Sequence, residues 1–441
     1  MSSNGSFADL AFVNGAVYTV DAARSWAHAV AVQHGRITTV GTDEAVRTVI
    51  GPHTEVVDLA GRMLVPGFQD AHVHPVSGGL DMLQCDLHDL SSQEDYLLAI
   101  KTYANDHPER EWILGGGWAM DVFPGGTPTK DLLDAIVPDR CVYLPNRDGH
   151  GVWVNSRALA LAGITKDTPD PPDGRIERDA DGEPSGTLHE GAAELVDRLT
   201  PTPTAAELSE GLAKGQEYLH SLGITAWQDA IVEDHEHSGG NFAAYIEAAG
   251  SGRLTARVVG ALWWDRHRGA EQIADLVALR ERSHVGRFSA SSVKIMQDGV
   301  CENFTAAVLE PYLDADGRAS ENRGISFVEP LALKGYVTEL DRLGFQVHFH
   351  ALAERGVRES LDAIEAALDA NGPTDNRHHL AHLQVVHPDD VPRFRTLNAV
   401  ANAQPLWAAH ESQMDDLTIP FLGEPRWRWQ YPFGSLVRAG A

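Results

Sequence analysis

Two patterns of apolar and polar residues divide the chain near residue 65. From Ala8 to about Val65, short runs such as ADLAFVNGAVYTV alternate apolar and polar positions, and Asn14-Gly15 and His34-Gly35 stand where hairpin turns are expected. After Pro66, short apolar runs alternate with helical patterns such as ERGVRESLDAIEAALDANG. We therefore expect an N-terminal β-sandwich module over residues 1–65 and an α/β barrel over residues 66–441.

Seven apolar runs after residue 65 have the length and flanks of barrel strands. Because helical patterns separate several of them, they predict βα units and a parallel sheet of the TIM-like (β/α)8 kind. Between the first and second runs lies a segment rich in Gly, Pro and Asp, which we interpret as an insertion or lid over about residues 75–199. The seven runs lie in GFQDAHVHP, LGITAWQDA, LTARVVGALWWD, SSVKIMQDGV, GFQVHFHAL, RHHLAHLQVV and LNAVANAQPLW.

Length and charge narrow the class of protein. A chain of 441 residues suits one large barrel with an additional lobe. The formal net charge of −28 argues against a nucleic-acid partner and against binding to an anionic membrane, since both require clustered basic residues. The expected partner is a small molecule.

The cysteines and the first residues of the chain bear on the cellular compartment of the protein. Cys85, Cys141 and Cys301 are odd in number and far apart, which disfavours a disulfide framework or a cysteine metal knuckle. The first residues lack a basic and apolar leader pattern, and no apolar run reaches about 18 residues. We expect a cytoplasmic protein.

The run LVPGFQDAHVHP places two histidines one residue apart at the end of a predicted strand. Side chains of a strand alternate between faces, so His72 and His74 point to the same side. Taken alone, the pair is also compatible with a solvated strand end. Its place in the barrel favours a metal site, because catalytic groups gather at the C-terminal ends of barrel strands.

Other predicted strands carry further potential ligands near their ends. Imidazole is a common ligand of zinc, whereas a lysine joins such a site only if carbamylation makes it anionic. An ordinary salt-bridged lysine is the alternative for Lys294. The candidates are Lys294, His348, His350, His378, His379 and His382.

These residues, together with several longer motifs, resemble the amidohydrolase superfamily of metal-dependent hydrolases. DLAGRMLVPGFQDAHVHP resembles the superfamily's entry into barrel strand one. RDGHGVWVNSRAL, RDADGEPSGTLHE, VKIMQDGV, HALAERGV and HLAHLQVV resemble the branch that includes N-substituted formamide deformylases. The resemblance spans nearly the whole chain and implies a barrel that holds one or two divalent metal ions, expected to be Zn²⁺.

The resemblance also assigns ligands residue by residue. His72 and His74 match the first pair, Lys294 the bridging carbamylated lysine, and His350 and His382 the histidines of strands five and six. Two departures are Ala353-Glu354, where Gly-Asp is common, and Ala381, where Glu usually precedes the histidine. Each departure weakens the expected support of the neighbouring ligand.

The remaining candidates are assigned by position. His348, His378 and His379 are interpreted as ordinary packed histidines, although His348 lies on the same face as His350. Most tryptophans are expected to pack in the core. The predicted substrate-binding residues are Trp118, His150, Asp298 and Gln404.

The end of the given sequence affects the functional prediction. The family has an aspartate at the end of strand eight, whereas the sequence stops at YPFGSLVRAGA, which resembles the segment leading into that strand. Asp415 and Asp416 precede this place and cannot be given the role. No catalytic acid or base is therefore assigned, and a seven-stranded barrel is expected to have two exposed edges.

The sequence predicts hydrolysis of a C–N bond in an amide, formamide or cyclic amide by metal-activated water. A deaminase or esterase on the same scaffold is one alternative, because the fold does not fix the substrate. An inactive truncated homologue that binds a metal or small molecule is another. A homodimer is expected only because the family resemblance implies one.

Overall fold

The computed structural model describes residues 7–234 and 240–441. These residues form two compact units, Met1–Gln69 and Asp70–Ala441. Among the helices of the described ranges, none combines the length and apolar character that a membrane span requires.

The first unit contains two small sheets. One has the strand order β5-β4-β1-β6 and the other the order β3-β2-β7. The elements are β1 (Leu10–Val13), β2 (Ala16–Tyr18), β3 (Trp26–Ala27), β4 (Ala29–Gln33), β5 (Arg36–Gly41), α1 (Asp43–Arg47), β6 (Glu55–Asp58) and β7 (Met63–Leu64).

Only one of the two predicted hairpin turns joins paired strands. His34 and Gly35 both have positive φ, and they connect the antiparallel strands β4 and β5, as a tight turn requires. Asn14 and Gly15 instead lie between β1 and β2, which belong to different sheets, so the prediction of a hairpin there was wrong. Asn14 Nδ2 donates to Asp58 Oδ1 at 2.9 Å, which secures this crossover.

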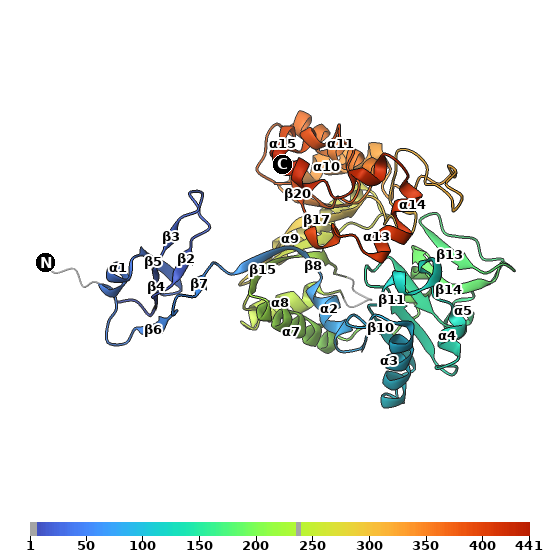
Figure 1. Ribbon diagram of the computed structural model, residues 1–441, viewed down its shortest axis with the longest axis horizontal. Helices are drawn as coiled ribbons and strands as arrows, with labels where there is room; N and C mark the ends of the chain where they lie inside the picture. The colour runs from blue at the N-terminus through green and yellow to red at the C-terminus, as the bar shows by residue number, and fades with distance from the viewer. Residues whose placement is uncertain (1–6, 235–239) are drawn as a thin grey trace. The chain divides into compact units, whose positions relative to one another are not determined.

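The second unit is built on a seven-stranded sheet with the order β20-β19-β18-β17-β16-β15-β8 (Figure 1). Neighbouring strands from β15 to β20 run parallel. The predicted TIM-like barrel is confirmed by this sheet, and its strands coincide with the seven apolar runs. They are β8 (Phe68–Val73), β15 (Ile224–Val232), β16 (Arg257–Trp263), β17 (Phe288–Met296), β18 (Gln346–Ala351), β19 (His379–His382) and β20 (Val400–Asn402).

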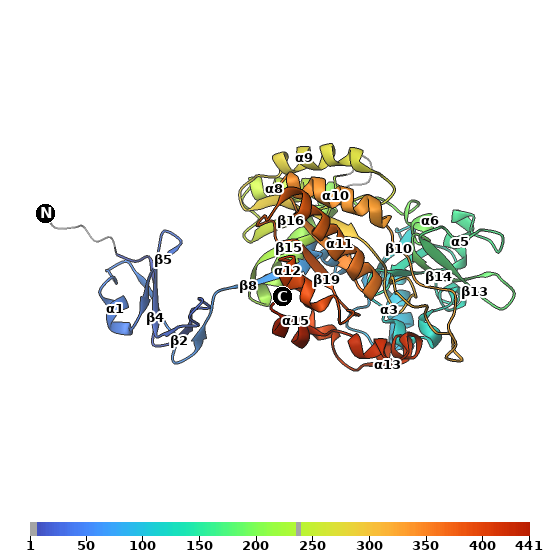
Figure 2. The ribbon, with the colours of Figure 1, turned by 90° about the horizontal axis from the view of Figure 1, so that it is seen from above.

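Amphipathic helices cover the outer side of this sheet (Figure 2). In α11, for example, Val357, Leu361 and Ile364 recur at helical spacing and are buried in the main core cluster together with Phe349 of β18. Burial of each such side chain contributes about 1.5–3 kcal/mol. The helices are α2 (Pro75–Asp81), α7 (Ala205–Ser221), α8 (Phe242–Gly250), α9 (Ile273–Arg282), α10 (Pro330–Arg342), α11 (Glu354–Asn371) and α12 (Val391–Thr396).

The two edge strands of the barrel sheet approach each other. Asn402 of β20 donates from Nδ2 to the carbonyl oxygen of Ala71 in β8 at 3.1 Å. This side-chain bond links the first and last strands of the sheet order, where backbone pairing between them is not formed.

The segment between β8 and β15 forms a second sheet, which we call the inserted sheet, with the order β13-β14-β12-β11-β10-β9. It has its own core, in which Trp118, Phe123 and Trp153 pack edge to face. Its elements are β9 (Cys85–Asp86), α3 (Gln93–Asp106), β10 (Trp112–Gly116), α4 (Lys130–Asp134), β11 (Cys141–Pro145), β12 (Gly151–Val154), α5 (Ser156–Ala162), β13 (Gly174–Arg178), β14 (Pro184–Glu190) and α6 (Glu194–Asp197).

After β20 the chain forms three short helices, α13 (Ser412–Leu417), α14 (Ile419–Leu422) and α15 (Phe433–Ala439). Leu417 at the end of α13 packs against the core of the inserted sheet. The segment after β20 therefore connects the barrel to the inserted sheet.

Candidate metal centre

Histidines from three barrel strands meet at the C-terminal ends of those strands. His72 is the penultimate residue of β8, and His74 follows that strand directly. His382 is the last residue of β19. We call the five residues His72, His74, His348, His350 and His382 the histidine cluster.

Ring contacts join the members of this cluster. His72 Nδ1 lies 2.8 Å from His348 Nε2, across the barrel from β8 to β18. The ring centroids of His72 and His74 are 5.2 Å apart, those of His72 and His382 4.7 Å, and those of His350 and His382 4.4 Å. The structure thus brings together the four histidines that the sequence assigned to metal binding, and adds His348.

Lys294 lies at the same end of the barrel. The parallel register pairs Lys294 of β17 with His348 of β18, and its side chain is only 2% exposed. Within the described ranges no carboxylate lies within ion-pair distance of its ammonium group. Burial lowers the pKa of Lys294 to about 7.

The buried imidazoles are neutral at pH 7. Burial and, second, the nearby Lys294 lower the pKa of His74 to about 3. Burial also holds the pKa values of His72, His348, His350 and His382 well below the ordinary value. Neutral imidazole is the form that ligates metals, because its second ring nitrogen carries a free lone pair.

Several ring nitrogens in the cluster are buried without a hydrogen-bond partner: His74 Nδ1, His348 Nδ1, His350 Nδ1 and His382 Nε2. His382 shows the arrangement most clearly. Its Nδ1 lies 2.7 Å from Gln404 Oε1, which fixes the proton on Nδ1 and leaves Nε2 as a lone pair. Its ring stacks on Trp407, with centroids 5.3 Å apart and planes 6° apart. An unpaired buried nitrogen costs stability unless it has a ligand role, so this donor set fits a divalent metal ion.

The predicted substrate-binding residues occupy different surroundings. Gln404 supports His382, as described. Asp298 is fully buried and accepts hydrogen bonds from the backbone N–H groups of Ala307, Leu352 and Ala353 at 2.9–3.0 Å. Burial outweighs these bonds and raises the pKa of Asp298 to about 7. Its Oδ1 lies 3.6 Å from His350 Nδ1, which is beyond hydrogen-bond distance.

His150 and Trp118 differ in their relation to the cluster. His150, which precedes β12 of the inserted sheet, places Nε2 3.2 Å from His350 Nε2. Trp118 is fully buried, donates from Nε1 to the carbonyl oxygen of Leu144 at 2.7 Å and packs in the core of the inserted sheet. The structure therefore brings His150 to the cluster and leaves Trp118 away from it.

Two further residues lie at this site. His348 was a candidate because it shares a strand face with His350, but the sequence analysis interpreted it as a packed histidine. Glu190, whose carboxylate contacts His150, had no signal beyond its place in the motif TLHE. His379 also touches the cluster, with its ring centroid 4.0 Å from that of His348.

A second group of potential ligands lies elsewhere. Among the described residues, Asp173, Glu194 and His267 are the group of three whose ligand atoms all lie within 4.8 Å of one another. Arg266 already occupies this group, with Nη2 2.8 Å from Asp173 and 3.2 Å from Glu194. In the part of the chain that the structure describes, no three ligand atoms of the histidine cluster lie within 4.8 Å of one another. Three of its rings must therefore move closer together to bind one ion.

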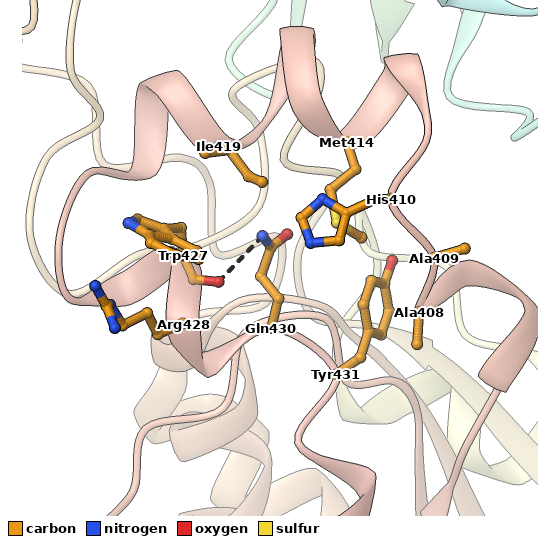
Figure 3. A pocket seen from close by; sticks show the side chains of 9 residues that line it. All are labelled: Ala408, Ala409, His410, Met414, Ile419, Trp427, Arg428, Gln430 and Tyr431. Atoms are coloured by element: carbon orange, nitrogen blue, oxygen red, sulfur yellow. Dashed lines mark hydrogen bonds between the residues drawn. The ribbon is translucent and has the colours of Figure 1, made fainter.

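A cavity of 390 Å³ lies in the segment after β20 (Figure 3). Ala408 and Ala409 directly follow Trp407, the residue stacked on His382, and they line its wall. Polar groups of His410, Gln430 and Tyr431 face into the same space (Figure 3). The cavity is thus formed by the segment that also covers His382.

Residues 55–441 match the model of the amidohydrolase family. The chain belongs to this family. The match includes the barrel and the inserted sheet, and it confirms the resemblance stated from the motifs.

Similar proteins cover most of the chain. The Arabidopsis thaliana protein LONG AFTER FAR-RED 3 is 32% identical over 99% of this chain and 74% of its own length. The N-substituted formamide deformylase of Arthrobacter pascens is 29% identical over 81% of this chain and 66% of its own length. A metal-dependent hydrolase from Pyrococcus furiosus has a crystal structure with the same fold, with a TM-score of 0.71 and 24% identity over 98% of this chain and 83% of that chain.

Proposed function

We propose that the protein hydrolyses a C–N bond in an amide, formamide or cyclic amide and that it depends on one or two divalent metal ions, with Zn²⁺ as the expected metal. The observation that carries the proposal is the set of neutral, buried and partly unpaired imidazoles at the C-terminal ends of the barrel strands. Membership of the amidohydrolase family supports it.

The chain's own residues hold and orient the site. His72, His74, His350 and His382 present ring nitrogens of the type that bind Zn²⁺, and Gln404 fixes the tautomer of His382. Lys294 joins this set as a carbamate, because an ammonium group has no lone pair for a metal. A bound divalent ion polarises a carbonyl oxygen and lowers the pKa of water at the site.

Substrate chemistry follows from the relatives and the site. The deformylase of A. pascens is named for N-substituted formamides, which supports a simple N-formyl amine as the first substrate to assay. The apolar face of Trp407 beside His382 supplies a surface for the substituent on nitrogen.

The experiment loads purified protein with Zn²⁺, measures bound metal by mass spectrometry, and assays N-formyl amines, other amides, esters and aminopurines. We expect release of formate or another acid from a C–N substrate, and its loss in His72→Ala. His53→Ala, at an exposed position of the first unit, is the control. Metal retained without turnover on the panel would instead support a binding protein. Turnover of esters or aminopurines alone would redefine the reaction.

A further inference from the structure

His150 and Glu190 of the inserted sheet form a buried pair, and His150 reaches the histidine cluster. His150 Nδ1 lies 3.0 Å from both carboxylate oxygens of Glu190, and their side chains are 12% and 4% exposed. Thr305 donates its hydroxyl hydrogen to Glu190 Oε1 at 2.8 Å. Although burial opposes it, the charge of Glu190 raises the pKa of His150 to about 8. When the ring is neutral, its contact with Glu190 keeps the proton on Nδ1 and leaves Nε2 as the free lone pair.

That free nitrogen faces another imidazole nitrogen. His150 Nε2 and His350 Nε2 are 3.2 Å apart. On its other side, His350 Nδ1 lies 3.6 Å from Asp298 Oδ1 and has no hydrogen-bond partner. Each ring thus directs Nδ1 to a buried carboxylate and Nε2 to the other ring.

Protonated His150 can donate from Nε2 to His350 Nε2, whereas beside neutral His150 neither neutral tautomer of His350 satisfies both contacts. With its proton on Nδ1, two lone pairs meet between the rings. With its proton on Nε2, a lone pair faces the carboxylate of Asp298. A cation between the two Nε2 atoms removes the conflict, and two Zn–N bonds of about 2.0–2.1 Å at a tetrahedral angle separate the nitrogens by about 3.3 Å.

We propose that His150 is an additional metal ligand, supplied by the inserted sheet and oriented by Glu190, which shares a divalent ion with His350. The proposal rests on the proposed metal-dependent function. It makes the inserted sheet part of the metal centre, with Glu190, His150 and the ion in a carboxylate–histidine–metal arrangement. A shared proton between the two rings, without a metal, is the competing explanation of the 3.2 Å contact.

The test titrates metal-free protein with Zn²⁺ and with Co²⁺, without substrate, in the wild type, His150→Gln and Glu190→Gln. We expect Glu190→Gln to weaken metal binding about 10–100-fold and His150→Gln to weaken it further. The visible Co²⁺ spectrum should change in His150→Gln, because a nitrogen ligand is lost. Circular dichroism and thermal unfolding check that each variant is folded.

His189→Gln is the matched control. His189 is a buried histidine of β14, one residue before Glu190, and its Nε2 lies 3.0 Å from a carboxylate oxygen of Glu177. It does not contact the histidine cluster, so its replacement should leave metal affinity and the Co²⁺ spectrum unchanged.

The outcomes separate this inference from the proposed function. Wild-type metal affinity and an unchanged Co²⁺ spectrum in folded His150→Gln would overturn the inference and leave the proposed function standing, and they would favour the shared proton. Absence of stoichiometric metal in the wild type would overturn both. If His150→Gln does not fold, Glu190→Gln decides, because wild-type affinity in that variant contradicts the proposed orientation.

Discussion

The histidines at the two ends of strand β19 differ in their hydrogen-bond partners. We call the end at His378 the scaffold end and the end at His382 the ligand end. His378, just before the strand, accepts a hydrogen bond at Nδ1 from the Val347 N–H at 3.0 Å and donates from Nε2 to Asp341 Oδ1 at 3.0 Å. His382, at the other end, has one nitrogen bound to Gln404 and the other buried without a partner. A buried histidine with both nitrogens satisfied belongs to the scaffold, whereas one left unsatisfied has a capacity for a ligand.

Asp341 shows how completely the scaffold end is satisfied. Although burial opposes its ionised form, hydrogen bonds from His378, Asn371, Asn376 and Thr374 hold its pKa below the usual range. The histidine cluster has no comparable set of donors. The unpaired ring nitrogens of the histidine cluster therefore lower the stability of the fold, and a bound ion would offset that loss.

The largest expected effect comes from breaking the ligand end. His382→Ala should remove a metal ligand and lower turnover of the N-formyl substrate on the order of 10³-fold or more, with loss of bound Zn²⁺. Steady-state kinetics and metal analysis of the same preparations test this. Retention of both metal and turnover would show that His382 is not a ligand.

Breaking the scaffold end should act on stability instead. Asp341→Ala removes the carboxylate that accepts from four donors, and it should lower the free energy of unfolding by about 3 kcal/mol. Denaturant unfolding measures the loss, and metal content of the folded variant should stay at the wild-type level. Asp375→Ala, at an exposed ion pair with Arg377, is the control and should cost less than about 1 kcal/mol.

Metal itself should distinguish the two ends. Zn²⁺ at 100 times its Kd should raise the free energy of unfolding by about 2.7 kcal/mol in the wild type. The same increment is expected in Asp341→Ala and none in His382→Ala. Thermal unfolding with and without Zn²⁺, against an EDTA-treated reference, provides the measurement. An equal increment in all three proteins would place the ion elsewhere.

Asp229 of β15 is a buried carboxyl group whose hydrogen bonds only partly offset the cost of burial. It accepts hydrogen bonds from Tyr245 and from the Ile231 N–H, yet burial raises its pKa to about 7 from the ordinary 3.8. Because the folded state favours the protonated acid, the stability that Asp229 contributes is fully present below pH 4 and is lost as the pH rises through about 7.

Replacing this carboxyl group should remove the pH dependence. Asp229→Asn should gain about 4 kcal/mol relative to the wild type between pH 4 and pH 8, since the amide never ionises. Unfolding free energies measured at several pH values give the difference. A difference that stays constant with pH would show that ionisation of Asp229 does not limit stability.

The barrel followed from the sequence, because apolar strand runs are local patterns. Histidines at strand ends gave the candidates, and the family resemblance selected His72, His74, His350 and His382, which the structure brings together. The contact between His72 and His348 depends instead on which side chains cross the barrel interior. The local pattern around Trp118 did not reveal that its indole fills the core of the inserted sheet.

The pairing of His150 with Glu190 was also beyond sequence reasoning. The two residues are 40 positions apart, and they meet because β12 and β14 are antiparallel neighbours in the inserted sheet. Nothing local distinguishes Glu190 from Glu177, which pairs with His189 instead. Strand register, which no local motif encodes here, decides which histidine reaches the histidine cluster.

The bond between Asn402 and Ala71 has a consequence for how the molecule is made. Its two residues are 331 positions apart. At a synthesis rate of 5–20 residues per second, β8 leaves the ribosome roughly 20–60 s before its partner in this bond exists. During that interval this edge of β8 lacks even the side-chain bond from Asn402 and is open to pairing with other chains. Chaperone dependence during translation is therefore expected to concentrate on this first strand, which also carries the first two histidines of the cluster.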